Sequence, residues 1–302
     1  MKVALVQMDI RWESAAENRE VAERLMLSAE KSDIYVLPEM WNTGVTTEPQ
    51  GVAEESPLSQ PLPRGGEEHA AHLSSVETRS ETLQWMQRMA DKLDAAVCGS
   101  IAVKTLSNSP SKGECSYRNR LYFVMPQETV KDPPLPSLKG REEMVNGEWL
   151  NCKFYDKHHL FSFGGETKHY TPGNEYVTVE WRGLRFHLST CYDLRFPLWL
   201  RNRDGYEVLI CVASWPSVRM HAWQVLLAAR AIENQCYVLG VNRIGKDPYC
   251  EYSGGTSVVD PFGFATVAPD NEACVLTKTL DLKRLRSFRE KFPVLKERDL
   301  FD

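Results

Sequence analysis

Three polar side chains that can do chemistry each close a short apolar run of the kind that forms a β-strand. These residues are Glu39, Lys157 and Cys191. A thiol can attack an electrophilic carbon, a carboxylate can carry the proton that the thiol gives up, and an ammonium can stabilise a developing negative charge. Together the three groups are suited to nucleophilic catalysis, provided that the fold brings them to one place.

The surroundings of Cys191 are those of a nucleophile at a turn. An extended run over residues 183–189 leads into it, and Pro197 is placed to open a helix at its first turn. We therefore expect a strand-to-helix turn, with the helix N-terminus favouring a thiolate. The alternative is a small buried hydrophobic residue, which most free cysteines are, and local context leaves both interpretations open.

Glu39 and Lys157 are weaker signals when each is taken alone. Carboxylates are rarely buried, so a glutamate that closes an apolar strand is unusual unless it is paired or functional. Glu39 alone is nevertheless more typical of a solvated loop. Lys157 alone, in a basic run, is more typical of a solvated face.

The overall composition limits the possible partners. The chain has 302 residues, 42% of them hydrophobic, with a net charge of −5. Without a basic excess we expect no nucleic acid partner. No apolar stretch approaches the length of a transmembrane helix, and the N-terminal run is too short for a signal peptide. We therefore expect a cytoplasmic protein without a membrane partner.

The cysteines do not form a metal or disulfide pattern. All eight are scattered, with no Cys-x-x-Cys pair and no zinc-ligand spacing. This arrangement predicts a reducing compartment, no structural metal and no cofactor. Cys98, Cys211 and Cys236 lie in apolar runs and are predicted to be in the core.

Strand-like and helical runs alternate along the chain, which is typical of a layered α/β fold. A hairpin is expected around Arg182 and Gly183, and Ser14 is placed to cap the first helix. Strands are predicted at 3–7, 34–37, 95–103, 120–125, 176–181, 184–189, 208–213, 237–242, 256–259 and 275–280, and helices at 15–29, 81–93 and 220–234.

Two polar, turn-forming stretches interrupt this pattern, near 46–80 and 106–147. Both are long for connections in a compact domain, so they are interpreted as insertions into a domain covering 1–280. We expect disordered surface excursions, and the alternative is a lid or wall over a pocket. The charged tail at 281–302 also carries aromatic residues.

Three motifs in order resemble those of the nitrilase, or carbon–nitrogen hydrolase, superfamily. They are Leu-Pro-Glu ending at Glu39, Tyr-x-Lys-x-His-Leu-Phe around Lys157, and Cys-Tyr-Asp-Leu-Arg-Phe-Pro from Cys191. The resemblance extends from residue 3 to residue 282. It implies an α-β-β-α sandwich that pairs into an eight-layer αββααββα homodimer or a higher even oligomer. The tail at 281–302 is similar to tails that reach a partner subunit, with a frayed terminus as the alternative.

The resemblance also implies roles for individual residues. Cys191 would form a thioester, Glu39 would carry the proton, and Lys157 with the backbone N–H of Tyr192 would hold the oxyanion. An ammonium beside the thiol is expected to lower the thiol pKa. Glu166 matches a second family glutamate, which would orient Lys157 and the substrate.

Other residues near the nucleophile are expected to shape the turn or to line the pocket. Arg195 is expected to form a buried pair with Asp193 that shapes the turn, or else to contact the substrate. Trp215 would close one pocket wall, although a core tryptophan fits nearly as well. Arg195 or Arg243 would meet a substrate carboxylate. The adjacent His158 and His159 are expected to be structural or surface residues.

Within the superfamily the chain is most similar to bacterial omega-amidases. That branch hydrolyses the terminal amide of 2-oxo dicarboxylate monoamides such as 2-oxoglutaramate. The second hypothesis keeps the fold and the chemistry but changes the substrate to a nitrile, an N-carbamoyl compound or an aliphatic amide. The third is a catalytically silent binding protein, against which the complete Glu39, Lys157 and Cys191 set argues.

Overall fold

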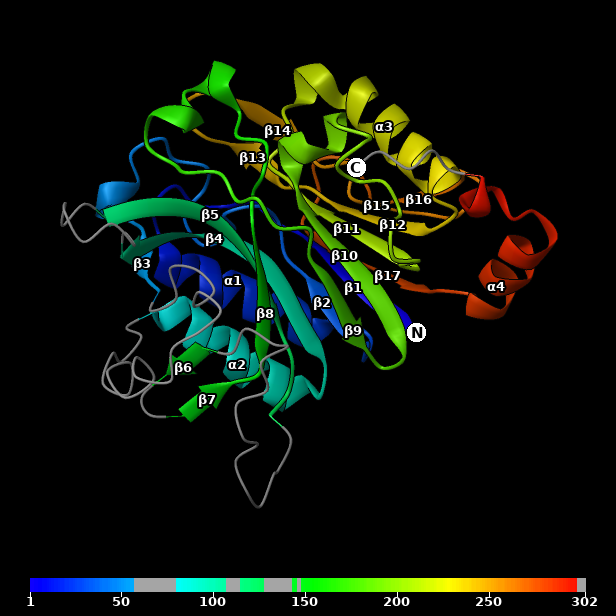
Figure 1. The fold of residues 1–302 in the computed structure, drawn as a ribbon. Coiled ribbons are helices and arrows are strands. Elements are labelled where there is room, and N and C mark those ends of the chain that lie inside the picture. Colours follow the sequence, from blue (N-terminus) through cyan, green and yellow to red (C-terminus); the bar gives the residue numbers. More distant parts are fainter. Residues whose placement is uncertain (57–79, 107–114, 128–142, 146–147, 298–302) are drawn as a thin grey trace, which may run out of the picture.

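A seven-stranded sheet is the first of two large sheets in the computed structural model (Figure 1). The structure describes the chain except residues 57–79, 107–114, 128–142, 146–147 and 298–302. The first sheet has the order β17-β1-β2-β4-β5-β8, with β3 paired to β4. Its strands are β1 (Lys2–Gln7), β2 (Ile34–Val36), β3 (Glu54–Glu55), β4 (Ala96–Leu106), β5 (Cys115–Val124), β8 (Cys152–Asp156) and β17 (Cys274–Thr279).

The second sheet has the order β16-β15-β12-β11-β10-β9. Its strands are β9 (Thr178–Trp181), β10 (Leu184–Thr190), β11 (Val208–Val212), β12 (Tyr237–Val241), β15 (Ser257–Val259) and β16 (Ala265–Val267). Two small hairpins complete the strand set, β6 (Glu143–Val145) with β7 (Glu148–Leu150) and β13 (Ile244–Lys246) with β14 (Glu251–Ser253).

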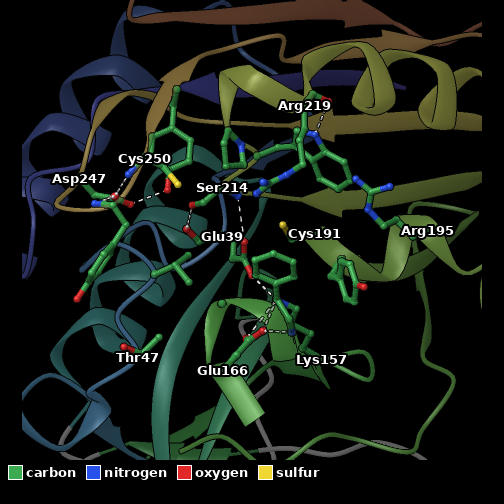
Figure 2. A pocket seen from close by; sticks show the side chains of 18 residues that line it. Glu39, Thr47, Lys157, Glu166, Cys191, Arg195, Ser214, Arg219, Asp247 and Cys250 are labelled. Atoms are coloured by element: carbon green, nitrogen blue, oxygen red, sulfur yellow. Dashed lines mark hydrogen bonds and ion pairs between the residues drawn. The ribbon is translucent and has the colours of Figure 1, made fainter. Parts of the chain in front are cut away.

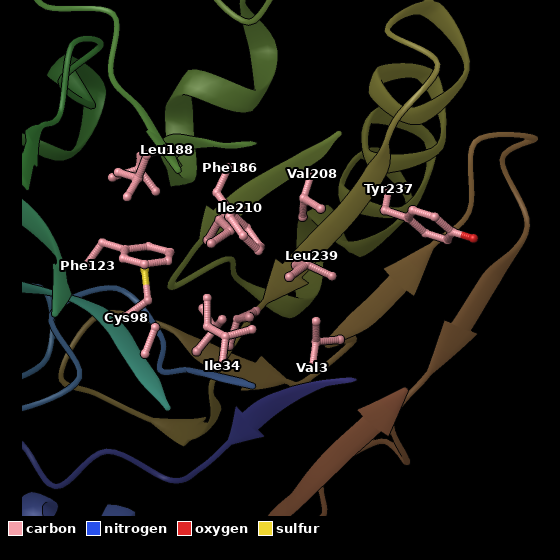
Figure 3. Packing of buried hydrophobic residues seen from close by; sticks show 14 of the residues in the cluster. Val3, Ile34, Cys98, Phe123, Phe186, Leu188, Val208, Ile210, Tyr237 and Leu239 are labelled. Atoms are coloured by element: carbon pink, nitrogen blue, oxygen red, sulfur yellow. The ribbon is translucent and has the colours of Figure 1, made fainter. Parts of the chain in front are cut away.

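The two sheets pack face to face, and helices cover their outer faces (Figure 1). In β1, Val3 and Leu5 point toward the second sheet while Ala4 and Val6 point outward, as the period of a strand requires. Figure 3 shows side chains of both sheets interlocked in the layer between them. Phe123 and Phe186 meet there with ring centroids 5.5 Å apart.

Each outer face has its own apolar layer. Helices α1 (Ala15–Ser28) and α2 (Glu81–Leu93) cover the first sheet, and α3 (Met220–Glu233) covers the second. In α3, Trp223 and Leu227 pack on Leu209 and Val238 of the sheet. The expected α-β-β-α order is therefore confirmed.

The strand directions bring the chemistry-bearing residues to one edge. Strands β10, β11 and β12 run parallel, as do β1, β2 and β4. Strand β8 also runs with β4, because β5 is antiparallel to both. The carboxyl ends of parallel strands lie at the same edge of a sheet, where α/β folds place their ligand sites. Glu39, Lys157 and Cys191 each follow such an end.

Most local expectations agree with the structure, and two differ. Ser14 stands at the N-cap position of α1, but its side chain makes no capping hydrogen bond. The β9–β10 hairpin turns at Arg182 and Gly183, which both have positive φ. Pro197, however, does not open an α-helix. The helical turn after β10 is the 3-10 helix η5 (Cys191–Arg195), which comes before the proline. Phe196 then takes an extended conformation (φ −113°, ψ 89°), because a residue before proline is pushed away from the helical region.

The expected insertions lie mainly outside the described residues. The tail is described to residue 297 and contains α4 (Leu282–Lys291). It packs on its own chain, since Leu285 is buried and the Arg289 guanidinium donates to the carbonyls of Gln235 and Tyr206. Within the described ranges, no helix is long and apolar enough to cross a membrane.

Candidate active site

A pocket opens at the strand ends of the two sheets (Figure 2). Its lining includes six ionisable side chains that are suited to catalysis or to substrate binding. They are Glu39, Lys157, Glu166, Cys191, Arg195 and Arg219. The cavity measures about 140 Å³, which favours a small substrate. The first four are the residues that the sequence predicted to be catalytic, and the structure brings them together.

Cys191 stands at a strained turn between β10 and η5. Its φ is +47°, a value that residues with a side chain rarely adopt, and such strain concentrates at functional sites. The turn is held by Asp193, which is fully buried. One Asp193 oxygen accepts from the Tyr155 hydroxyl at 2.7 Å and the Thr190 N–H at 3.0 Å, and the other accepts from the His159 N–H at 2.8 Å.

These contacts correct the expected Asp193–Arg195 pair. Asp193 is bonded to Tyr155 and His159 instead, and the Arg195 guanidinium lies over the Trp215 ring, 4.9 Å from its centroid. The reason is the tight 3-10 turn, which directs Asp193 into the protein and leaves Arg195 at the pocket.

Two carboxylates hold the ammonium of Lys157. Its Nζ lies 2.9 Å from Oε1 of Glu39 and 2.8 Å from Oε2 of Glu166. The three side chains are at most 4% exposed. Glu166 is fixed further by the Phe161 N–H, which donates to Oε2 at 2.6 Å. Burying three ionised groups together costs desolvation energy. We attribute the presence of this triad to a need for charges held in fixed positions at this place.

Two residues that the sequence reasoning missed complete the network. The Asn119 amide donates to Glu39 at 2.8 Å and to Glu166 at 3.2 Å. The Ser214 backbone N–H donates to the other Glu39 oxygen at 3.0 Å. Asn119 is a buried amide in β5, the strand that continues into Leu121. A polar amide leading into this apolar run was the signal that the sequence offered.

The protonation states follow from burial and charge. Burial alone would lower the pKa of Lys157, but the Glu166 and Glu39 carboxylates outweigh it and raise that pKa well above its usual value. Burial, and next the facing Glu39 carboxylate, raise the pKa of the Cys191 thiol well above its ordinary value, while Lys157 opposes them. The expected lowering of the thiol pKa by Lys157 is therefore present, but burial and Glu39 outweigh it, and the net pKa shift of Cys191 is upward rather than toward a stabilised thiolate.

Replacing Lys157 with methionine should raise the Cys191 pKa further, because a cation that lowers it is removed. Alkylation by iodoacetamide at pH 8 should slow relative to the wild type, and the rate should rise at a higher pH. The measurement is the alkylation rate of Cys191 against pH, followed by intact mass. An unchanged profile would show that Lys157 does not act on the thiol.

The remaining predicted residues lie at different depths. Tyr192 and Trp215 line the pocket, and Trp215 is 3% exposed, so its wall and core roles coincide. Arg243 does not reach the pocket. It is fully buried and donates to backbone carbonyls of Ile10 and Ile244. Arg219, which the sequence reasoning did not single out, lines the pocket instead.

The two histidines after Lys157 support the turn. His158 stacks on Trp199 with ring centroids 3.6 Å apart, and its Nδ1 lies 2.6 Å from the Gly173 carbonyl oxygen. His159 stacks on Phe196 and bonds to Asp193. Both are therefore structural, as expected.

Comparison with known proteins gives the family. The profile of the Carbon-nitrogen hydrolase family matches residues 2–290. The chain is 35% identical over 303 residues to omega-amidase YafV of Escherichia coli (strain K12), covering 100% of this chain and 98% of that one. It is 28% identical over 305 residues to the 2-oxoglutaramate amidase of Bacillus subtilis (strain 168), covering 99% and 98%.

A solved structure agrees with these matches. XC1258 from Xanthomonas campestris, a CN-hydrolase superfamily protein with an arsenic adduct in its active site, superposes with a TM-score of 0.78 at 31% identity. The match covers 100% of this chain and 98% of that one. The fold, the pocket at the strand ends and the family profile agree, and the chain belongs to the carbon–nitrogen hydrolase family.

Proposed function

We propose that this protein is an omega-amidase that converts 2-oxoglutaramate or 2-oxosuccinamate to the 2-oxo dicarboxylate and ammonia through a thioester on Cys191. The observation that carries the proposal is the buried Glu39–Lys157–Glu166 network beside a strained cysteine in a small pocket with two arginines. The names of the E. coli and B. subtilis relatives support the substrate class.

Acylation begins with the thiol and the carboxylate that faces it. As Sγ of Cys191 attacks the amide carbon, its proton passes to Glu39 and the carbonyl electron pair moves to oxygen. The oxyanion is stabilised by Nζ of Lys157 and by the backbone N–H of Tyr192, which lies in the first turn of η5 where amides lack a helical acceptor. The C–N bond then breaks, Glu39 returns the proton to nitrogen, and ammonia leaves.

Deacylation uses the same groups in reverse. Water attacks the thioester carbon while Glu39 takes its proton, and the C–S bond breaks. The thiol regains the proton from Glu39, so the cycle leaves the enzyme unchanged. The high Cys191 pKa suits this scheme, because proton transfer to Glu39 accompanies attack and a preformed thiolate is not required.

Arg195 is proposed to bind the carboxylate at the far end of the substrate. Its guanidinium lies over the Trp215 ring, and its side chain lines a mostly apolar pocket. A charge-assisted pair there would orient the opposite end, the amide, toward Cys191. A cytoplasmic location is proposed as well, because the seven cysteines whose side chains are described are all free.

The substrate assignment is tested with a panel of small amides and nitriles and with ammonia as the readout. We expect the highest kcat/KM for 2-oxoglutaramate or 2-oxosuccinamate, and a value lower by at least an order of magnitude for a neutral amide of similar length, because one ion pair is lost. Equal or better turnover of the neutral amide would rule out the assignment. Preference for a nitrile or an N-carbamoyl compound would favour the second hypothesis of the same fold.

A homodimer that packs through α3 is also proposed. Val225 and Ile232 on this helix are exposed by 51% and 54%, and Leu198 near the same layer is 58% exposed. Exposed apolar side chains on one helix are typical of an interface. The resemblance to the family's subunit interface supports a second copy as the occupant.

Replacing Val225 and Ile232 with glutamate should therefore turn a dimer into a monomer, because burying two carboxylates in an apolar interface is unfavourable. Light scattering at micromolar concentration measures the mass. The matched control is Leu27→Glu, an exposed position on α1 at the opposite layer, which should leave the mass unchanged. A single-chain mass for the wild type would contradict the proposal.

A further inference from the structure

Arg219 is the second guanidinium of the pocket, and the proposed reaction does not yet use it. It ends the 3-10 helix η6 (Ser217–Arg219), which follows Ser214 and Trp215 at the carboxyl end of β11. Its side chain reaches across the opening, since the guanidinium lies 5.5 Å from the centroid of the Phe161 ring on the other wall. Figure 2 shows Lys157 and Glu166 on one side of Cys191 and Arg219 on the other.

The backbone of Arg219 is held in a fixed place. The Trp215 indole N–H donates to the Arg219 carbonyl at 2.8 Å, and the Trp215 N–H donates to the Asn242 side chain at 2.7 Å. Asn242 in turn donates to the carbonyls of Trp215 and Gly254. The preceding residue, Ser214, donates to Glu39. The segment that positions the base therefore also positions the Arg219 guanidinium.

The carboxylates that line the pocket are bonded to other groups, so Arg219 is available to bind a ligand. Lys157 is shared by Glu39 and Glu166. The third lining carboxylate, Asp247, accepts from the N–H groups of Tyr249 and Cys250, and from the Tyr252 hydroxyl, and faces Arg243 at 3.9 Å. Within the part of the chain that the structure describes, neither Arg195 nor Arg219 has a carboxylate partner.

We propose that Arg219 sets the preference for a 2-oxo acid over the corresponding 2-amino acid, because it donates to the 2-oxo oxygen and repels a 2-ammonium group. The inference rests on the proposed omega-amidase function. A guanidinium has five N–H donors and no acceptor, so it pairs with a carbonyl oxygen but not with an ammonium. In a small, mostly apolar cavity two like charges repel more strongly than in water. Arg195 then binds the substrate carboxylate, and Arg219 contacts the substituent on the neighbouring carbon, carbon 2.

The test compares four substrates that differ only at carbon 2: 2-oxoglutaramate, 2-hydroxyglutaramate, glutaramate and glutamine. For the wild type we expect the highest kcat/KM with the oxo compound and the lowest with glutamine. In Arg219→Gln the ratio of kcat/KM for the oxo compound to kcat/KM for the amino compound should fall at least tenfold, mainly because kcat/KM for the oxo compound falls. If Arg219 had only a structural role, kcat/KM for all four substrates would fall by the same factor.

Two further variants complete the design. Arg219→Lys keeps the charge and loses the planar fork, so turnover of the oxo compound should fall while glutamine stays poor. Arg88→Gln makes the same charge change at an exposed position on α2 and should leave all four values unchanged. If the Arg219→Gln variant does not fold, the same four kcat/KM values are measured for Arg219→Lys instead.

The outcomes separate this inference from the proposed function. If the wild type turns over 2-oxoglutaramate but the oxo-to-amino ratio stays within twofold in Arg219→Gln, the role of Arg219 is wrong and the omega-amidase assignment stands. If the wild type favours a neutral amide or a nitrile over all four acids, the proposed function fails and this inference fails with it.

Discussion

Replacing Cys191 with alanine should lower kcat by roughly five to six orders of magnitude, as in other enzymes that lose the covalent nucleophile. The change removes the sulfur and little volume, and it keeps a residue with the same backbone requirement at φ +47°. Thermal unfolding should therefore stay close to that of the wild type. Cys191→Ser should also be nearly inactive, because a hydroxyl is much less acidic than a thiol.

The same pocket offers a matched control. Cys250 also lines the cavity, and its side chain is half-buried. Cys250→Ala should keep turnover within a few-fold of the wild type, since the proposed reaction uses no second thiol. Substantial activity in Cys191→Ala, or a loss in Cys250→Ala as large as in Cys191→Ala, would contradict the assignment of the nucleophile.

The second large effect is expected for Glu39→Gln. The shape is preserved and the proton acceptor is lost, so kcat should fall by roughly 10²–10⁴-fold, the usual contribution of a general base. The loss should be in kcat rather than in KM, because in the proposed mechanism Glu39 acts on the reacting atoms and not on the substrate carboxylate. Ammonia release at saturating substrate measures it.

Glu166→Gln separates the two glutamates. Glu166 bonds to Lys157 and to the Phe161 N–H but, in the proposed mechanism, transfers no proton. Its variant should therefore lose less activity than Glu39→Gln and should keep the shape of the pH profile. Equal losses with equal changes in the pH profile would remove the reason to assign proton transfer to Glu39.

The sequence predicted the residues that lie at strand ends, because the motifs and the strand ends coincide. Glu39, Lys157 and Cys191 each follow a recognisable apolar run, and parallel strands carry such residues to one edge. The alternation of β1 and the turn at Arg182 and Gly183 were also readable, since both depend on local geometry.

What the sequence did not reveal depends on tertiary contacts. Asn119 lies in mid-strand, and its role arises only because β5 runs beside β8, where the Lys157 N–H donates to the Asn119 carbonyl at 2.9 Å. The exchange of Arg243 for Arg219 as a pocket residue depends on how η6 folds over the cavity. The raised pKa of Cys191 follows from burial, which a motif does not report.

The thioester is tested most directly by quenching the enzyme in acid shortly after mixing with 2-oxoglutaramate and measuring the intact mass. We expect a mass gain equal to the substrate less ammonia, located on the peptide that contains Cys191 and absent from Cys191→Ala. Hydroxylamine should remove it, as it does other thioesters. Ammonia release at full rate without any adduct on Cys191, or with the adduct on another residue, would contradict the mechanism.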